Sequence, residues 1–182
     1  MSKPDLRRHF RDLRDKAASD SEAAANAVAD HFLADTDIAP GSVVAGYWPM
    51  RNELDPRPLL IRLGQKGCRL ALPAVVEKNA PLVFRHWTPG DDLVEGAFGT
   101  QEPMAKAGDI EPDVILLPLL AFDDNGWRLG YGGGFYDRTL SAGKGLAVGL
   151  AFAAQQTKSL PHEAHDRKLH RVVTEQGMRT FE

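Results

Sequence analysis

The sequence of 182 residues has the size of a single globular domain, and 43% of its residues are hydrophobic, which is enough for a buried core. A formal net charge of −3 argues against a chain whose whole surface binds nucleic acid. The single cysteine, Cys68, excludes an internal disulfide, is typical of a reducing compartment and is expected to be a buried structural thiol. No apolar run approaches the length of a membrane-spanning helix. We therefore predict one soluble, cytoplasmic domain over residues 1–182, and we expect a monomer because the sequence shows no obvious interface helix.

The first part of the chain predicts two helices. Apolar residues recur at helical spacing over residues 4–17, and Pro4 suits the first turn of that helix. Ser19 and Glu22 have the spacing of a capping box, which predicts a second helix through about Leu33.

The first predicted helix is locally basic. Residues 3–16 hold six basic and three acidic side chains, a local charge of +3. Lys3 and Arg7 are one turn apart on one face, where they can hold a phosphate group. A solvated helix face, or a weak nucleic-acid contact, explains the same pattern.

Strands and helices alternate after these helices. Asp55 and Pro56 predict the N-cap and first residue of a helix through about Lys66, and residues 88–112 predict a long loop. This alternation predicts a three-layer α/β/α domain with a mainly parallel sheet, in which ligands bind beyond the carboxyl ends of strands. The predicted strands are residues 42–48, 68–76, 82–87, 114–122, 146–152 and 171–174.

A glycine-rich loop in the segment GWRLGYGGGFYDR, residues 126–138, is the most informative feature of the sequence. Four glycines lie between a predicted strand and a helix that can begin at FYDRTLSA. Backbone N–H groups in such a loop, together with a helix N-terminus, favour an anion such as phosphate. The loop matches neither G-x-G-x-x-G nor the P-loop motif, so the residues alone leave phosphate binding and a structural turn both open.

Acidic side chains near the predicted strand ends are candidates for binding. Glu53 follows the strand that ends near Trp48, and it can hold polar N–H groups of a planar ligand while the indole stacks on that ligand. A solvated turn residue is the plainer interpretation of Glu53. Asp137 follows the glycine loop and can bind Mg²⁺ there, together with Asp166, although an acidic residue at a helix start needs no such role.

The segment PHEAHDRKLH, residues 161–170, holds three of the six histidines and suggests a metal site. Its first two histidines are three positions apart rather than four, so it is not the zinc motif H-E-x-x-H. Zinc therefore ranks below Mg²⁺ bound by Asp166, and a solvated loop remains open.

Taken together, these segments resemble the 5-formyltetrahydrofolate cyclo-ligase family. The resemblance spans Lys3 to about Glu175, and its most specific part is LLPLLAFDDNGWRLGYGGGFYDRTL, residues 116–140. Other parts are the N-terminal K-x-x-x-R, YWPMRNELDPRPLL, the GTQEP turn and LP-x-E-x-HD. The resemblance implies a fold like that of sugar-phosphate isomerases and acyl-CoA transferases (NagB/RpiA/CoA transferase-like). It also implies conversion of 5-formyltetrahydrofolate to 5,10-methenyltetrahydrofolate with ATP as co-substrate and Mg²⁺ as metal ion.

The resemblance also assigns roles to individual residues, which we state as expectations. Arg128 and Tyr136 are the expected catalytic side chains, and Asp137 and Asp166 are the expected magnesium ligands. The expected ATP-binding residues are Lys3, Arg7, Arg128, Leu129, Gly130, Tyr131, Gly132, Gly133, Gly134, Phe135 and Tyr136. The expected folate-binding residues are Trp48, Glu53, Tyr131, Gly132, Gly133, Gly134 and Phe135.

Two other classes of function stay open from the sequence. A sugar-phosphate isomerase or an acyl-CoA transferase can share the fold, and neither reaction hydrolyses a nucleotide. A non-catalytic RNA-binding protein would use the basic first helix and bind with strong salt dependence. The expected partner is a small reduced formyl folate, with no nucleic acid and no membrane.

Overall fold

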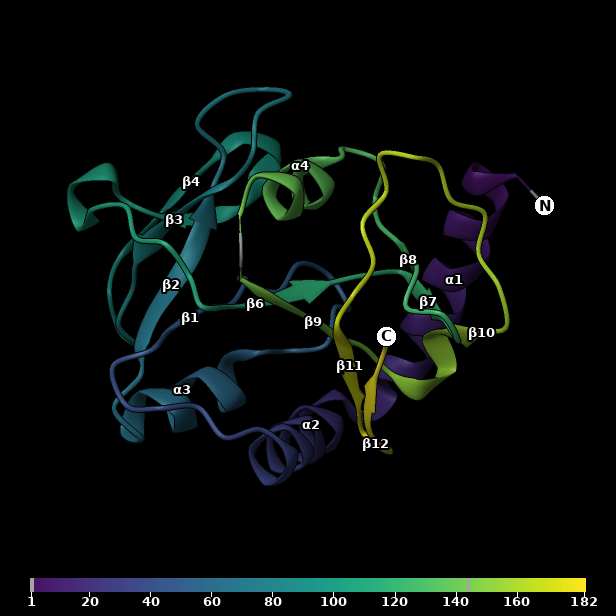
Figure 1. Cartoon of the computed structure of the whole chain (residues 1–182), viewed down its shortest axis with the longest axis horizontal. Coiled ribbons are helices and arrows are strands. Elements are labelled where there is room, and N and C mark those ends of the chain that lie inside the picture. Colours follow the sequence, from purple (N-terminus) through teal and green to yellow (C-terminus); the bar gives the residue numbers. More distant parts are fainter. Residues whose placement is uncertain (1, 144) are drawn as a thin grey trace.

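A mainly parallel sheet forms the centre of the computed structural model, which describes residues 2–143 and 145–182 (Figure 1). Within these residues the sheet has seven strands in the order β12-β11-β9-β6-β1-β2-β3. Neighbouring strands are parallel except at the two edges, where β3 and β12 run antiparallel to their neighbours. The strands are β1 Val43–Ala45, β2 Arg69–Ala74, β3 Val83–His86, β6 Val114–Pro118, β9 Leu146–Leu150, β11 Arg171–Thr174 and β12 Gly177–Thr180.

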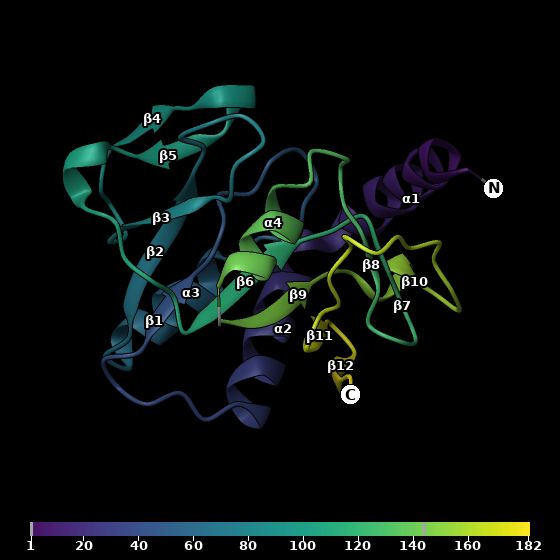
Figure 2. The same ribbon diagram turned by 45° about the horizontal axis from the view of Figure 1, so that its top comes forward.

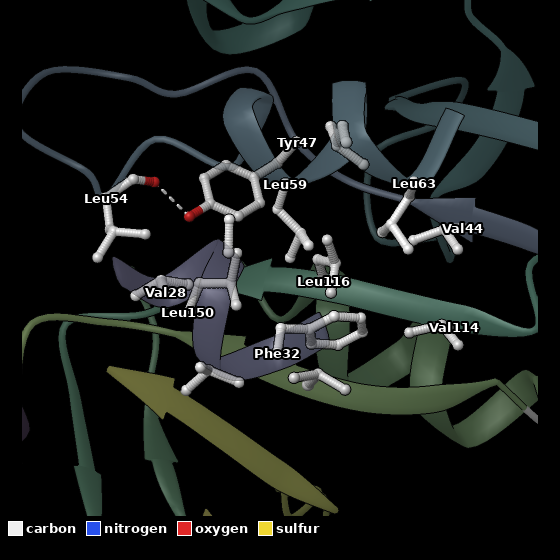
Figure 3. Close-up of a cluster of buried hydrophobic side chains, with 14 of the residues drawn as sticks. Val28, Phe32, Val44, Tyr47, Leu54, Leu59, Leu63, Val114, Leu116 and Leu150 are labelled. Atoms are coloured by element: carbon white, nitrogen blue, oxygen red, sulfur yellow. Dashed lines mark hydrogen bonds between the residues drawn. The ribbon is translucent and has the colours of Figure 1, made fainter. Parts of the chain in front are cut away.

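Helices cover both faces of this sheet, which confirms the predicted three-layer α/β/α architecture (Figures 1 and 2). Helices α2, Ser21–Asp35, and α3, Arg57–Gln65, pack on one face, and α4, Phe135–Ala142, packs on the other. The central strands β6 and β9 are buried almost throughout, as expected for parallel strands covered on both sides. The core between these two helices and the sheet includes Val28, Phe32, Leu59 and Leu63 from the helices and Val44, Leu116 and Leu150 from the strands (Figure 3).

The first helix, α1, Lys3–Ala17, lies beside the sheet rather than on one of its faces (Figure 2). It packs against a small three-stranded sheet in the order β10-β7-β8, through buried Phe10 and Leu129. The predicted start of this helix is confirmed, because Pro4 lies in its first turn and the Ser2 hydroxyl accepts a hydrogen bond from the backbone N–H of Asp5 at 3.3 Å. The strands of the small sheet are β7 Ala121–Asp123, β8 Arg128–Leu129 and β10 Gln156–Thr157.

Several predicted boundaries differ from the structure. The strand predicted over 42–48 is only Val43–Ala45, and α3 begins at Arg57 with Pro56 as its N-cap, one residue later than predicted. Helix α2 begins at Ser21 without a side-chain cap, because Ser19 lies in a short 3₁₀ turn, Ala18–Asp20; the predicted capping box is therefore wrong. The predicted strand 114–122 divides after Pro118, whose missing N–H ends the ladder, and the chain then enters the small sheet as β7.

The predicted loop 88–112 contains a two-stranded antiparallel sheet, formed by β4, Leu93–Glu95, and β5, Gln101–Pro103. Buried Glu102 holds it in place by accepting hydrogen bonds from the Val75 backbone N–H at 3.1 Å and the Thr100 hydroxyl at 2.9 Å. Strands are predicted from a hydrophobic pattern. A buried, hydrogen-bonded carboxylate holds this hairpin instead, so the sequence pattern did not reveal it. None of the described helices is both long and apolar enough to span a membrane.

Candidate functional site

The glycine loop joins β8 to α4 in the structure. The predicted helix after the loop is confirmed, but the strand directly before it is the short β8, which was not predicted. Gly132 and Gly134 have φ angles of +99° and +68°, in the left-handed region that glycine adopts without steric cost. Gly134 is also the N-cap residue of α4, and no side chain caps the helix there. The first N–H groups of α4 have no partner within the helix, and a helix N-terminus of this kind favours an anion.

Helix α1 contacts the loop through Arg7. The Arg7 Nε donates a hydrogen bond to the carbonyl oxygen of Gly130 at 3.0 Å. A Cβ atom built on Gly132 would lie 3.3 Å from the Arg7 guanidinium carbon, so the absence of a side chain at Gly132 lets the arginine lie against the loop backbone. Helix α1 and the glycine loop, which are both expected to bind ATP, are therefore in contact.

Arg128 and Asp137 bind each other across the loop. Arg128 Nη2 lies 2.7 Å from Asp137 Oδ1, and the Arg128 side chain is only 5% exposed. The backbone N–H of Arg167 donates to the same carboxylate oxygen at 3.0 Å, and Arg128 donates in turn to the Arg167 carbonyl. These bonds hold the segment that follows Asp166 against the start of α4.

Lys3 binds the second predicted magnesium ligand. Its Nζ lies 3.0 Å from Asp166 Oδ2 and 2.8 Å from Glu163 Oε1. The hydrogen bond with Glu163 raises the pKa of Lys3. Burial by itself would raise the pKa of Asp166, but the Glu163 backbone N–H and the Lys3 ammonium bring the pKa below its usual value. Asp166 is therefore ionised at neutral pH.

A cavity of about 620 Å³ lies along the glycine loop and α4. Gly132, Gly133, Gly134 and Asp137 line it, together with Arg138, which flanks the loop, and His165 and Arg167 of the segment 161–170. The Arg138 guanidinium bonds the Gly133 carbonyl at 2.9 Å and lies 4.9 Å from the centre of the Phe135 ring. Cationic side chains and a glycine backbone on one wall suit a polyphosphate group.

Glu53 lies in a turn that its own backbone and Tyr47 hold in shape. Its Oε2 accepts a hydrogen bond from the Met50 backbone N–H at 2.8 Å. The Tyr47 hydroxyl donates to the carbonyl of the next residue, Leu54, at 2.5 Å (Figure 3). These hydrogen bonds fix the position of the carboxylate. The simpler interpretation, that Glu53 is a freely solvated turn residue, is therefore wrong.

Tyr131 connects this turn to the glycine loop. Its hydroxyl donates to Glu53 Oε1 at 2.5 Å, so the two predicted ligand-binding segments meet in the structure. Trp48 lies nearby in sequence, and Arg57 covers its ring at 4.8 Å from the centroid. Trp87 approaches Trp48 edge-on at 6.3 Å.

Burial sets the protonation states around Glu53. It raises the pKa of the Glu53 carboxyl, while hydrogen bonds from Tyr131 and the Met50 N–H oppose that shift. Burial also raises the pKa of the Tyr131 and Tyr136 phenols, and the Glu53 carboxylate raises both further. The two phenols are consequently neutral at physiological pH and act as hydrogen-bonding groups rather than as phenolates.

The backbone of Arg167 links the two predicted magnesium ligands, because its N–H donates to Asp137 at 3.0 Å and Asp166 is the preceding residue. Carboxylate oxygens are the ligands that Mg²⁺ prefers, so Asp137 and Asp166 fit that ion. Within residues 2–143 and 145–182, no three His, Cys, Asp or Glu side chains gather into a complete metal-binding cluster. Two carboxylates fit an ion that keeps its remaining ligands from water and substrate phosphates.

Arg14 and Tyr47 are two further residues of this site that were not among the predicted ones. Arg14 Nη1 donates to the Tyr131 hydroxyl, and the arginine is only 1% exposed. Its position seven residues after Arg7 places it two turns along the same side of α1, a signal that the sequence offered. Tyr47 gave no polar signal, since it ends an apolar run.

Comparison with known proteins identifies the family. The model of the "5-formyltetrahydrofolate cyclo-ligase family" matches residues 1–175. A 5-formyltetrahydrofolate cyclo-ligase of Escherichia coli K12 is 40% identical over 145 residues, which cover 75% of this chain and 80% of the relative. One from Haemophilus influenzae is 30% identical over 177 residues, which cover 92% of this chain and 95% of the relative.

A solved structure agrees with these sequence matches. The NMR structure of Aquifex aeolicus 5,10-methenyltetrahydrofolate synthetase superposes with a TM-score of 0.82 at 32% identity. The superposition covers 100% of this chain and 94% of the other. A 5,10-methenyltetrahydrofolate synthetase from Mycoplasma pneumoniae has the same fold, with a TM-score of 0.73 at 20% identity over 96% of this chain and 99% of the other. By sequence and by fold, this chain belongs to the 5-formyltetrahydrofolate cyclo-ligase family.

Proposed function

We propose that this chain converts 5-formyltetrahydrofolate to 5,10-methenyltetrahydrofolate and uses MgATP to do so. Family membership supports the folate conversion. One contact of the structure supports a two-substrate site in particular. The Tyr131 hydroxyl bonds Glu53 at 2.5 Å, which brings a carboxylate able to hold a pterin next to a loop suited to phosphate.

The chemistry of the reaction explains the need for ATP. A formamide oxygen is a poor leaving group, so N10 of the folate cannot displace it directly. Transfer of the γ-phosphoryl group to that oxygen releases ADP and turns the oxygen into part of a phosphate leaving group. N10 then attacks the formyl carbon, the C–O bond breaks, and the five-membered ring closes with release of phosphate. The protein's task is largely to position both substrates and to stabilise charge.

The nucleotide would lie along the glycine loop. Gly132, Gly133 and Gly134 line the cavity, and Arg7 reaches the loop from α1 at Gly130. Lys3, at the start of α1, binds Asp166, the neighbour in sequence of the cavity residue Arg167. Arg128 is buried and already holds Asp137, so its guanidinium has a fixed place from which to stabilise charge on a transferring phosphoryl group. We propose Arg128 as the catalytic cation on this basis.

Asp137 and Asp166 would hold the magnesium ion. Lys3 pairs with Asp166 and Arg128 pairs with Asp137, so each carboxylate already has a cationic partner. A bound Mg²⁺ would supply positive charge to the phosphate oxygens of the nucleotide.

The folate would occupy the side of the loop that faces Glu53. The ionised carboxylate accepts hydrogen bonds from N–H groups of a pterin, and Trp48 offers the ring face that Arg57 leaves uncovered. Gly132 to Gly134, without side chains, allow the substrate to lie against the backbone, and Tyr131 and Phe135 border it. Neutral Tyr136 would hydrogen-bond a reacting oxygen rather than remove a proton.

An absorbance assay tests the proposal. Purified protein is mixed with 5-formyltetrahydrofolate, with or without ATP and Mg²⁺, and the near-ultraviolet band of the methenyl product is followed. Product that forms only when both ATP and Mg²⁺ are present supports the proposal. Product without ATP contradicts the role of the nucleotide, and folded protein without any product contradicts the folate conversion.

We also propose that the chain acts as a monomer in the cytoplasm and binds neither nucleic acid nor membranes. Light scattering of the purified protein at several concentrations checks the first point, since a constant mass near 19.9 kDa is expected. Salt-dependent RNA binding by the basic helix α1 would contradict the exclusion of nucleic acid.

A further inference from the structure

The buried guanidinium of Arg14 is not used by the proposed reaction. Arg14 lies near the end of α1 and is 1% exposed. One of its nitrogens, Nη1, donates to the Tyr131 hydroxyl. Among the described residues, its Nε and Nη2 are buried without a hydrogen-bond partner. Burying a charge without full pairing is costly, so its position calls for a compensating interaction.

The compensating charge is the carboxylate of Glu53. Arg14 Nη1 and Glu53 Oε1 both lie within hydrogen-bonding distance of one atom, the Tyr131 hydroxyl oxygen. The phenol can accept from the guanidinium and donate to the carboxylate at the same time, so its single proton is directed at Glu53. Cation, phenol and carboxylate form one chain of charge-assisted hydrogen bonds.

A second contact holds helix α1 against the turn that carries Glu53. Asn52 Nδ2 donates to Asp15 Oδ1 at 3.2 Å, and these are the direct neighbours of Glu53 and Arg14 in sequence. Helix α1 is therefore bound to the turn that carries Glu53 independently of Tyr131.

We propose that Arg14 is a positioning residue for folate binding, which keeps Glu53 ionised and keeps the Tyr131 hydroxyl directed at it. This inference deepens the proposed function, because it rests on Glu53 as the group that holds the pterin. Helix α1 then serves both substrates: its start reaches the nucleotide side through Lys3 and Arg7, and its end reaches the folate side through Arg14.

The charges around Glu53 determine the sign of the effect. Burial raises the pKa of Glu53, and Arg14 and Arg51 oppose that shift. The other titratable groups facing it, Tyr47, Tyr131 and Tyr136, have pKa values raised by burial and stay neutral. Removal of the Arg14 charge should therefore move the Glu53 pKa upward.

The first experiment measures the Glu53 carboxyl directly, without any ligand. The protein is labelled with ¹³C at glutamate side chains and titrated by NMR, and the Glu53 signal is assigned by its loss in Glu53→Gln. We expect the Glu53 pKa to rise in Arg14→Met and to stay near the wild-type value in Arg14→Lys, which keeps the charge. An unchanged Glu53 pKa in Arg14→Met overturns the inference.

The second experiment measures folate binding by calorimetry with 5-formyltetrahydrofolate alone. In Arg14→Met, the loss of binding at acid pH should begin at a higher pH than in the wild type. The ATP KM should not change. If the Glu53 pKa moves but Glu53→Gln binds folate normally at every pH, the proposed role of Glu53 is wrong while its coupling to Arg14 stands.

Thermal unfolding by itself does not separate this role from a merely structural one. Removal of one partner of a buried charge pair is destabilising, so Arg14→Met should melt below the wild-type temperature, and only the Glu53 pKa and the folate-specific kinetics distinguish the two roles. A large fall in melting temperature, with folate and ATP kinetics impaired alike and no shift of the pH profile, would assign Arg14 to folding alone and overturn the inference.

Discussion

The guanidinium of Arg128 binds the carboxylate of Asp137 across the glycine loop, with Nη2 2.7 Å from Oδ1. The two residues flank the loop, so their bond closes it at its base. Because Arg128 is the more deeply buried partner, loss of the carboxylate would leave its charge without compensation.

Asp137→Asn should therefore impair both the ion site and the loop. We expect the Mg²⁺ concentration needed for half-maximal turnover to rise by about 10- to 100-fold, the usual effect of losing a metal-site carboxylate interaction. Activity titrated against Mg²⁺ measures this change. Asp12→Asn on the exposed face of α1 serves as the matched control, and equal Mg²⁺ curves for both variants would contradict the assignment of Asp137.

Glu53→Gln should stabilise the fold at neutral pH. The folded-state pKa of Glu53 is raised by burial, so ionisation costs stability as the pH rises through that pKa. The glutamine variant avoids this cost, and we expect it to be more stable than the wild type at pH 7 to 8. Below the unfolded-state pKa both proteins are neutral at this position, so the gain should vanish near pH 4. Unfolding by urea at a series of pH values measures it, and a gain that grows toward acid pH would refute this reasoning.

Gly132→Ala should lower affinity for ATP. The residue has a φ of +99°, and an added Cβ would lie 3.3 Å from the Arg7 guanidinium. We expect a stability loss of about 1 kcal/mol from backbone strain and a raised ATP KM from displacement of Arg7. Gly41→Ala is the control, because Gly41 also has a positive φ but nothing lies within 4 Å of its added Cβ. It should lose comparable stability and keep its ATP KM; a raised ATP KM in Gly41→Ala as well would show that strain alone is responsible.

Tyr47→Phe, a substitution at a buried core residue, should weaken folate binding. The Tyr47 hydroxyl bonds the Leu54 carbonyl at 2.5 Å, and its loss leaves that buried acceptor unpaired. We expect about 1 to 3 kcal/mol lower stability and a raised folate KM, because the turn at Glu53 loses its support. Steady-state kinetics with each substrate varied in turn measure the effect. A change confined to the ATP KM would contradict this view of the turn.

Much of the fold was predictable because its central strands have a simple sequence pattern. Residues 114–117 and 146–152 are almost entirely apolar, which is typical of parallel strands covered on both faces. The hairpin of β4 and β5 was missed because its buried anchor is Glu102, and a carboxylate gives no hydrophobic period. Strand β12 was missed for a similar reason, since its residues Gly177–Thr180 lie at an edge and are partly exposed.

The site was only partly predictable for a different reason. The glycine loop and its flanking residues are contiguous, so the sequence displays them together. The contact between Tyr131 and Glu53 joins residues 78 positions apart, and only the packed fold reveals it. Arg14 was visible as one basic residue among several, but its burial depends on how α1 packs against the small sheet.

The bond between Lys3 and Asp166 spans 163 positions of the chain. Its two ends meet only after α1 and the segment around Asp166 have both docked. Contacts so distant in sequence carry a large loop-closure cost and form late in most folding reactions. Recovery of catalytic turnover during refolding should therefore lag behind recovery of helical signal, and turnover would report completion of the native state more faithfully than any spectroscopic probe of secondary structure.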